Sequence, residues 1–209
     1  MSSLISELQH EIISQSHSIA DLLRKGLVVA SKLKLRDFEK WILNELEGYF
    51  EATKIPIYRS LTGEIEVFNY NINRWMPINI GSEYIENRIC TIEIQESVFE
   101  IEKMLEQNDN IVVYSIPRND ELKLMREHLL DNKPSLIILK TQIASIIDIV
   151  KTNLLKWCLR LEKANIIGEG LSFTPKEVEK AQNIYVNNFF DKVSNSQINS
   201  NSKKSKQNN

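Results

Sequence analysis

The amino-acid sequence predicts an α+β domain that is mainly α-helical, and three observations support this class. Apolar residues recur at steps of three and four over most of the 209 residues, which is the helical period. Proline, glycine and alternating residues interrupt that period between about residues 55 and 80, as expected for a small antiparallel β insert. Hydrophobic residues make up 42% and charged residues 26%, so the chain can bury an ordinary core.

The N-terminal part of the chain predicts a group of three helices. Residues 4–15 and 19–33 each carry an apolar stripe, and Ser18 with Asp21 gives the second helix an N-cap and an acidic first turn. Residues 35–49 continue the period, with Trp41 at the edge of the stripe and Gly48 near the end. Because little separates the second and third helices, they form either an antiparallel pair or one kinked rod.

The β insert begins where Pro56 stops the third helix. We interpret residues 57–61 as a strand, Thr62-Gly63 as a turn and residues 64–70 as the second strand of a hairpin. Residues 71–80 predict a second hairpin or an ordered loop. Aromatic side chains of the insert either line a groove or pack the hairpin onto the helices: Tyr58, Phe68, Tyr70 and Trp75.

The second half of the chain ends in a long helix pair. Helices are predicted near residues 97–105 and 119–130, with a short apolar β-like run at 111–114 between them. The longest periodic stripe predicts a helix over about 141–164. A capping box at Thr174 and Glu177 then starts a last helix that runs to about Phe190. We expect one domain over residues 1–192 and a disordered polar tail over residues 193–209.

Composition and missing motifs exclude several classes of function. A formal net charge of -2 argues against binding nucleic acid through bulk charge. No uninterrupted apolar window is long enough to span a membrane, and the N-terminus lacks the basic start of a secretory signal, so we expect a cytoplasmic protein. Cys90 and Cys158 stand alone, without a metal-binding spacing. Phosphate-binding glycine loops and common hydrolase motifs are missing, so we expect no cofactor, no metal and no recognisable catalytic centre.

Two charged groups leave alternatives open. Acidic residues of the third helix, Glu39, Glu45 and Glu47, either form a solvated face or contribute to a metal-dependent nuclease. Basic residues around Arg24 and Lys25 either form a solvated face or bind nucleic acid or an acidic partner. In both cases the solvated face is the favoured interpretation, because acidic and basic residues interleave along the helices.

Several segments of the sequence together form a set that resembles a known family. Each segment alone is weak evidence, and the match depends on their order and spacing. The set comprises residues 18–33, Phe38, Trp41, residues 45–49, residues 55–59, Trp75-x-Pro77, Trp157, residues 161–162 and residues 168–173. Over about residues 4–180 it resembles the AbiTii domain, an abortive-infection-associated domain of bacterial antiphage proteins. The resemblance implies a bacterial cytoplasmic protein from a prophage or defence island, and it supplies no catalytic residues. The candidate binding surface consists of positions that match its pattern or lie in the insert: Arg24, Lys25, Trp41, Tyr58, Arg59, Trp75 and Glu169.

The favoured hypothesis is a noncatalytic phage-defence module that binds a partner protein and gates growth arrest. The partner is expected to be a neighbouring defence component or a phage component, whereas a nucleic-acid partner is less favoured and a membrane is not expected. One alternative is a toxin enzyme such as a metal-dependent nuclease, which needs Glu39, Glu45 or similar acids to meet a basic surface. Another is a helical oligomerisation domain that forms homo-oligomers through spare apolar faces.

Overall fold

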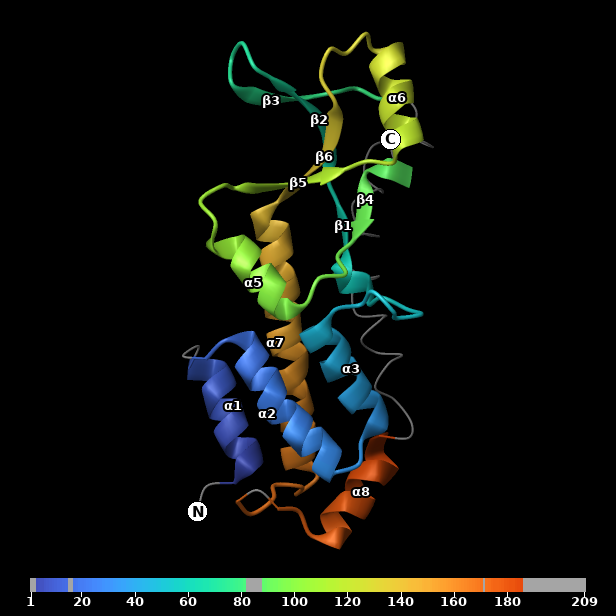
Figure 1. The fold of residues 1–209 in the computed structure, drawn as a ribbon. Coiled ribbons are helices and arrows are strands. Elements are labelled where there is room, and N and C mark those ends of the chain that lie inside the picture. The colour runs from blue at the N-terminus through green and yellow to red at the C-terminus, as the bar shows by residue number, and fades with distance from the viewer. Residues whose placement is uncertain (1–2, 15–16, 82–87, 171, 186–209) are drawn as a thin grey trace, which may run out of the picture.

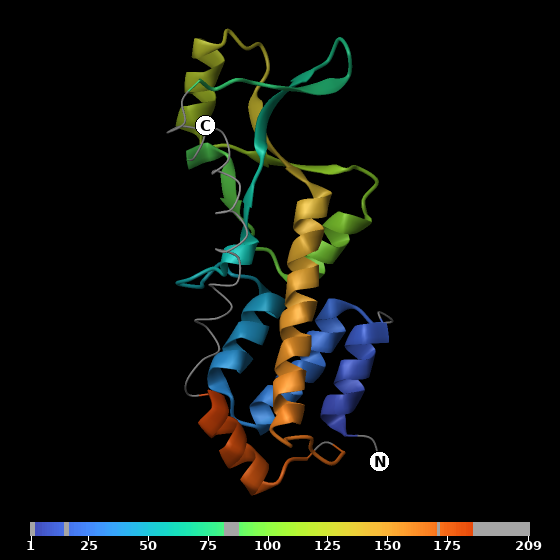
Figure 2. The same ribbon diagram turned by 180° about the vertical axis from the view of Figure 1, so that it is seen from behind.

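The computed structural model describes residues 3–14, 17–81, 88–170 and 172–185. The body is elongated, and its axis is helix α7 (Lys140–Lys163), whose 24 residues span about 36 Å. Helices α1, α2 and α3 surround the C-terminal half of α7, and the four-stranded sheet lies beyond its N-terminus (Figure 1 and, from behind, Figure 2). The prediction of a mainly helical α+β chain is confirmed.

The N-terminal helices are α1 (Leu4–Ser14), α2 (Ile19–Lys32) and α3 (Arg36–Glu47). The predicted N-cap of α2 is present, since the Ser18 hydroxyl accepts a hydrogen bond from the Asp21 amide at 3.1 Å. Lys34 adopts a φ of 57° in the short connection, and α3 folds back along α2 as an antiparallel pair rather than one rod. The Phe38 ring stacks on Trp157 of α7 with 4.0 Å between ring centroids, which holds the pair against the axis.

Within the described residues, six strands form two antiparallel sheets. The smaller sheet pairs β1 (Ser60–Thr62) with β4 (Thr91–Glu93), and the larger has the order β3-β2-β6-β5. The strands of the larger sheet are β2 (Glu64–Asn69), β3 (Arg74–Pro77), β5 (Ile111–Ser115) and β6 (Pro134–Leu139). The predicted insert of about residues 55–80 therefore supplies only β1, β2 and β3, and strands from later in the chain (β4, β5 and β6) complete both sheets.

The predicted hairpin of residues 57–61 and 64–70 is wrong. Ile57–Arg59 forms a short 3₁₀ helix (η1), and the chain continues from β1 into β2 without reversing (Figure 1). A Cβ on Gly63 would lie 2.2 Å from the Ile137 carbonyl oxygen, so glycine is required by the close passage of β6 and not by a turn. The actual hairpin joins β2 to β3, and Asn73 adopts a φ of 52° in its turn.

The remaining helices lie where the sequence predicts them. Helix α5 (Val98–Glu106) begins at a capping box formed by Ser97 and Glu100, and α6 (Arg118–Glu127) follows β5. Helix α8 (Pro175–Tyr185) begins at the predicted capping box, in which the Thr174 hydroxyl and the Glu177 carboxylate exchange hydrogen bonds with each other's backbone amides. The predicted end of this helix near Phe190 and the predicted disordered tail at 193–209 lie outside the described residues. None of the described helices is long and apolar enough to cross a membrane.

One buried apolar cluster runs from α1 through α7 to the sheet. The stripe on α7 occupies the positions that the sequence predicts: Ile143, Ile146, Ile147, Val150, Leu154, Trp157, Cys158 and Leu161. Because these side chains recur over the length of the axial helix, the helical half and the sheet half share one interior. That shared interior also encloses the charged residues of the site described next.

Candidate functional site

The junction between α3 and the strands places several polar side chains in the interior. Helix α3 ends at Gly48, whose φ of 95° suits glycine, and a Cβ there would approach the Gln95 carbonyl oxygen to 2.9 Å. The Tyr49 amide donates to the same Gln95 oxygen at 2.7 Å, which ties the helix end to the segment before α5. The chain then returns beneath α3 as η1, so that Tyr58 and Arg59 face the helix that precedes them.

A buried ion pair between Glu45 and Arg59 forms the centre of the junction. Both side chains are completely shielded from solvent, and the Arg59 Nη2 atom donates to Glu45 Oε2 at 2.6 Å. Arg59 Nη1 also donates to the carbonyl oxygens of Ile94 at 3.0 Å and Glu96 at 2.7 Å. The guanidinium carbon lies 4.5 Å from the centre of the Tyr49 ring, which adds a cation–π contact.

Two phenol groups complete the coordination of the Glu45 carboxylate. Tyr49 Oη donates to Oε1 at 2.6 Å and Tyr58 Oη donates to the same oxygen at 2.5 Å. The Trp41 indole Nε1 in turn donates to Tyr58 Oη at 2.9 Å. We call these five residues, Trp41, Glu45, Tyr49, Tyr58 and Arg59, the junction network. Every charge in the network has a partner, as a stable buried charge requires.

The electrostatics of the junction network keep its phenols protonated. Burial raises the pKa of Tyr49 and of Tyr58, and the nearby negative charge of Glu45 raises both further. Burial alone would lower the pKa of Arg59, but attraction to Glu45 outweighs it and the pKa is raised. The network therefore holds an arginine cation and two neutral hydrogen-bond donors around the Glu45 carboxylate. This arrangement fixes the position of α3 relative to η1.

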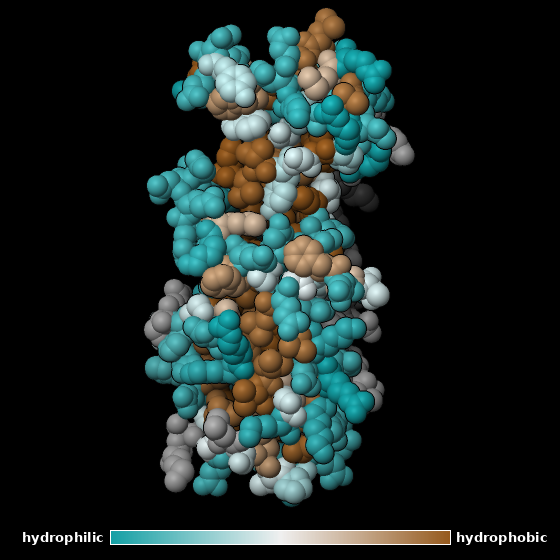
Figure 3. Space-filling view, in the orientation of Figure 1, coloured by the Kyte–Doolittle hydropathy of each residue, from teal (hydrophilic) through white to brown (hydrophobic). Residues whose placement is uncertain are grey.

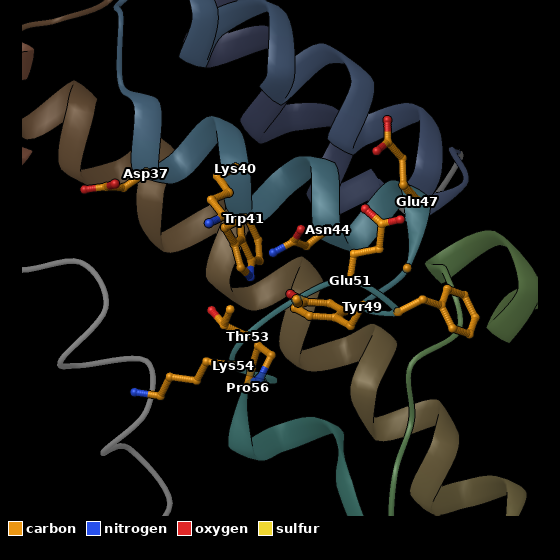
Figure 4. Close-up of a pocket in the computed structure, with 13 residues that line it drawn as sticks. Asp37, Lys40, Trp41, Asn44, Glu47, Tyr49, Glu51, Thr53, Lys54 and Pro56 are labelled. Carbon is orange, nitrogen blue, oxygen red and sulfur yellow. The ribbon is translucent and has the colours of Figure 1, made fainter.

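A cavity of about 810 Å³ opens beside the junction network, between α3 and residues 48–56. Lys40, Trp41 and Asn44 extend into it from α3, and Tyr49, Thr53 and Pro56 come from the facing segment (Figure 4). The cavity lining contains three acids and two lysines: Asp37, Glu47, Glu51, Lys40 and Lys54. Phe50, also in the lining, is 64% exposed. A mixed-sign, aromatic lining suits a polypeptide partner better than a polyphosphate, which would favour a positive site.

The structure brings together only part of the predicted binding surface. Trp41, Tyr58 and Arg59 meet in the junction network, where they are buried rather than on the surface, although Trp41 also lines the cavity. The other four predicted residues lie on separate elements.

Those four residues have local contacts of their own. Arg24 forms an exposed ion pair with Asp21 at 2.8 Å, and the Lys25 amine contacts the Glu11 carboxylate. Half-buried Trp75 packs edge-to-face on Phe68 of the sheet, with 5.3 Å between ring centroids. Exposed Glu169 lies in the turn after α7, where its backbone amide donates to the Ser172 carbonyl oxygen at 2.9 Å.

Sequence reasoning missed the role of Glu45 and Tyr49. Glu45 was expected on a solvated acidic face, but it is fully buried. A signal for this was available, since Glu45 lies four residues after Trp41 and four before Tyr49, on the face of α3 that also carries the apolar stripe. An acid on that stripe needs a buried cation, and Arg59 is the neighbour that supplies it.

Comparisons with known proteins give one match. A protein-family model, AbiTii, matches residues 3–185 and so covers most of the chain. No curated protein and no solved structure matches the chain. Among the described residues, no group of three or more histidine, cysteine, aspartate or glutamate side chains has the arrangement of a metal site.

Proposed function

Because this chain belongs to the AbiTii family, which implies abortive-infection defence against phage, we propose that it is a noncatalytic binding component of that response. In this proposal the cavity beside α3 receives a protein partner, either a neighbouring defence component or a phage component. Occupation of the cavity would then gate growth arrest. The family membership supports the defence role, and the geometry of the junction network supports binding rather than chemistry.

The observation that carries the noncatalytic part of the proposal is the saturation of Glu45. Its carboxylate accepts hydrogen bonds from Arg59, Tyr49 and Tyr58, and its side chain has no exposed surface. A general base or a metal ligand needs a free lone pair directed at a substrate or ion. Glu45 therefore acts to hold α3 on η1, and the cavity beside the junction network offers aromatic and mixed-charge contacts instead.

The competing nuclease hypothesis needs Glu39, Glu45 or similar acids to meet a basic surface. The two residues are six positions apart on α3, which places them about 120° apart around the helix axis. Glu45 faces the interior, whereas Glu39 is partly exposed. No contact between described residues favours this alternative. Degradation of RNA or DNA by the purified chain with Mg²⁺ or Mn²⁺ would nevertheless overturn the noncatalytic proposal.

A phage-infection assay tests the binding role directly. Cells carrying the gene with its neighbours would be compared with cells carrying Phe50→Ala, which removes the exposed aromatic ring at the cavity. We expect Phe50→Ala to restore plaque formation, because exposed aromatic residues supply much of the energy at protein interfaces. Tyr70→Ala is the matched control, since Tyr70 is 73% exposed but lies on the distant hairpin. Equal protection by both variants would count against the cavity as the binding surface.

A further inference from the structure

Strand β5 is an outer strand of the four-stranded sheet, and one of its long edges has no backbone partner within the described residues. Its sequence is Ile-Val-Val-Tyr-Ser, without a charge or a proline. It pairs with β6 on one side only, with Val112 opposite Ile138 and Val113 opposite Ile137. Exposed edges of this kind are ready to pair with another strand.

The hydrogen bonds of the sheet show which backbone groups face that edge. The Lys140 amide donates to the Asn110 carbonyl oxygen at 3.0 Å, so residues 110 and 140 form a hydrogen-bonded pair. In an antiparallel ladder such pairs alternate with non-bonded pairs. Residues 112 and 114 therefore bond to β6, whereas the N–H and C=O groups of Ile111, Val113 and Ser115 point away from it. No described residue provides a hydrogen bond to these outward groups.

The other outer strand of the same sheet is protected. β3 is a residue shorter than β5, carries the charged Arg74 at its start, and ends with Pro77, which has no N–H group to offer. Charges, prolines and short strands are the usual means of preventing strand addition. The β3 edge of the sheet thus carries features that prevent strand addition, whereas the β5 edge carries none of them. This difference indicates that the β5 edge pairs with another strand.

We propose that β5 pairs in antiparallel fashion with β5 of a second copy of this chain, centred on Val113. In that register Val113 faces its counterpart and Ile111 faces Ser115 of the other copy. The pairing joins all of the outward backbone groups, because each of these facing pairs exchanges two hydrogen bonds. An antiparallel strand pair with one central residue is self-complementary, which is the condition for a twofold symmetric interface.

Side chains around the edge suit a second copy. Val113 is 46% exposed and Leu139 of β6 is 52% exposed, and both lie on the open face of the sheet, where Figure 3 shows apolar side chains gathered. Symmetry brings the two open faces together into one continuous apolar surface. At the ends of the pair, Asp109 of one copy comes opposite Pro117 of the other, beside Arg118, so the flanking charges are opposite in sign.

The size of the interface sets its strength. β5 provides five residues, whereas a standard interface uses about 20–30 residues on each side. The dimer is therefore reversible and depends on concentration. It does not rest on the proposed binding cavity, which is lined by α3 and residues 48–56 and by no residue of β5.

Sedimentation velocity of the full chain over a wide concentration range tests this proposal. The wild-type mass should rise from that of one chain towards that of two, and Val113→Lys should weaken the association more than about tenfold by placing two like charges at the centre of the pair. Met76→Lys is the matched control, because Met76 is 45% exposed on the protected β3 edge. A wild-type chain that stays monomeric throughout, or two lysine variants that associate alike, overturns the proposal.

Disulfide trapping tests the proposed pairing register of the two β5 strands. It introduces no charge, so its result does not depend on whether the lysine variants fold. Two Val113→Cys residues would face each other with about 5.5 Å between their Cα atoms, within the range that a disulfide bridges. Mild oxidation should give a covalent dimer for Val113→Cys and not for Met76→Cys. A dimer formed equally by both cysteine variants, or by neither, contradicts pairing through β5.

Discussion

Replacing Glu45 by glutamine is the most informative perturbation of the junction network. The substitution keeps the size of the side chain but removes the negative charge that faces Arg59 at 2.6 Å. Arg59 would then remain charged, because its guanidinium stays protonated at any accessible pH. Since this cation has no exposed surface, the change leaves an uncompensated charge in the interior.

The expected cost follows from that burial. Removing one partner of a buried ion pair costs about 3–5 kcal/mol of unfolding free energy. The two carbonyl oxygens of Ile94 and Glu96 still solvate the guanidinium, so the lower end of that range applies to Glu45→Gln. A loss of about 3 kcal/mol is a large part of the stability of a domain of this size. Glu47→Gln, on the exposed face of the same helix, should change stability by less than about 0.5 kcal/mol.

Urea unfolding followed by circular dichroism measures both variants, provided that the transition is two-state. Adding Arg59→Met to Glu45→Gln completes a double-mutant cycle. Because the two side chains are in direct contact, the double variant should lose less stability than the sum of the single variants, by about 0.5–3 kcal/mol. Additive effects, or a loss below about 1 kcal/mol for Glu45→Gln, would refute the assignment of the ion pair as the element that holds α3 to η1.

Two further predictions concern titratable groups. Burial and the Glu45 charge raise the pKa of Tyr49 and Tyr58 in the folded chain above the unfolded value of about 10. The stability that these two phenols contribute is therefore complete below pH 10 and falls as the pH rises beyond it. Urea unfolding at a series of pH values above 10 should show a shallower fall for Tyr58→Phe, because that variant has one titrating phenol fewer. Burial also raises the pKa of the Cys158 thiol to about 12. A thiol reagent at neutral pH should therefore label half-buried Cys90 and leave Cys158 unmodified until the chain unfolds. Labelling of Cys158 at the same rate as Cys90 would contradict its burial.

The sequence by itself determined the positions of the helices and the caps at which two of them begin. The stripe of α7, the N-cap at Ser18 and the capping box at Thr174 all occur as the residue pattern predicts. These features depend on residues within one or two turns of each other, so a local pattern contains the whole cause. The fold class follows from the same local information, because a long apolar stripe must be covered by other elements.

Only the tertiary structure decided the strand partners and the site. β1 pairs with β4 rather than with β2, and Gly63, between β1 and β2, lies where β6 passes too close for a side chain. Glu45 is buried because Arg59, 14 residues away on another element, supplies the charge that makes its burial tolerable. The pairing of strands and of buried charges depends on which distant segments the core brings together. A local sequence pattern does not contain that information.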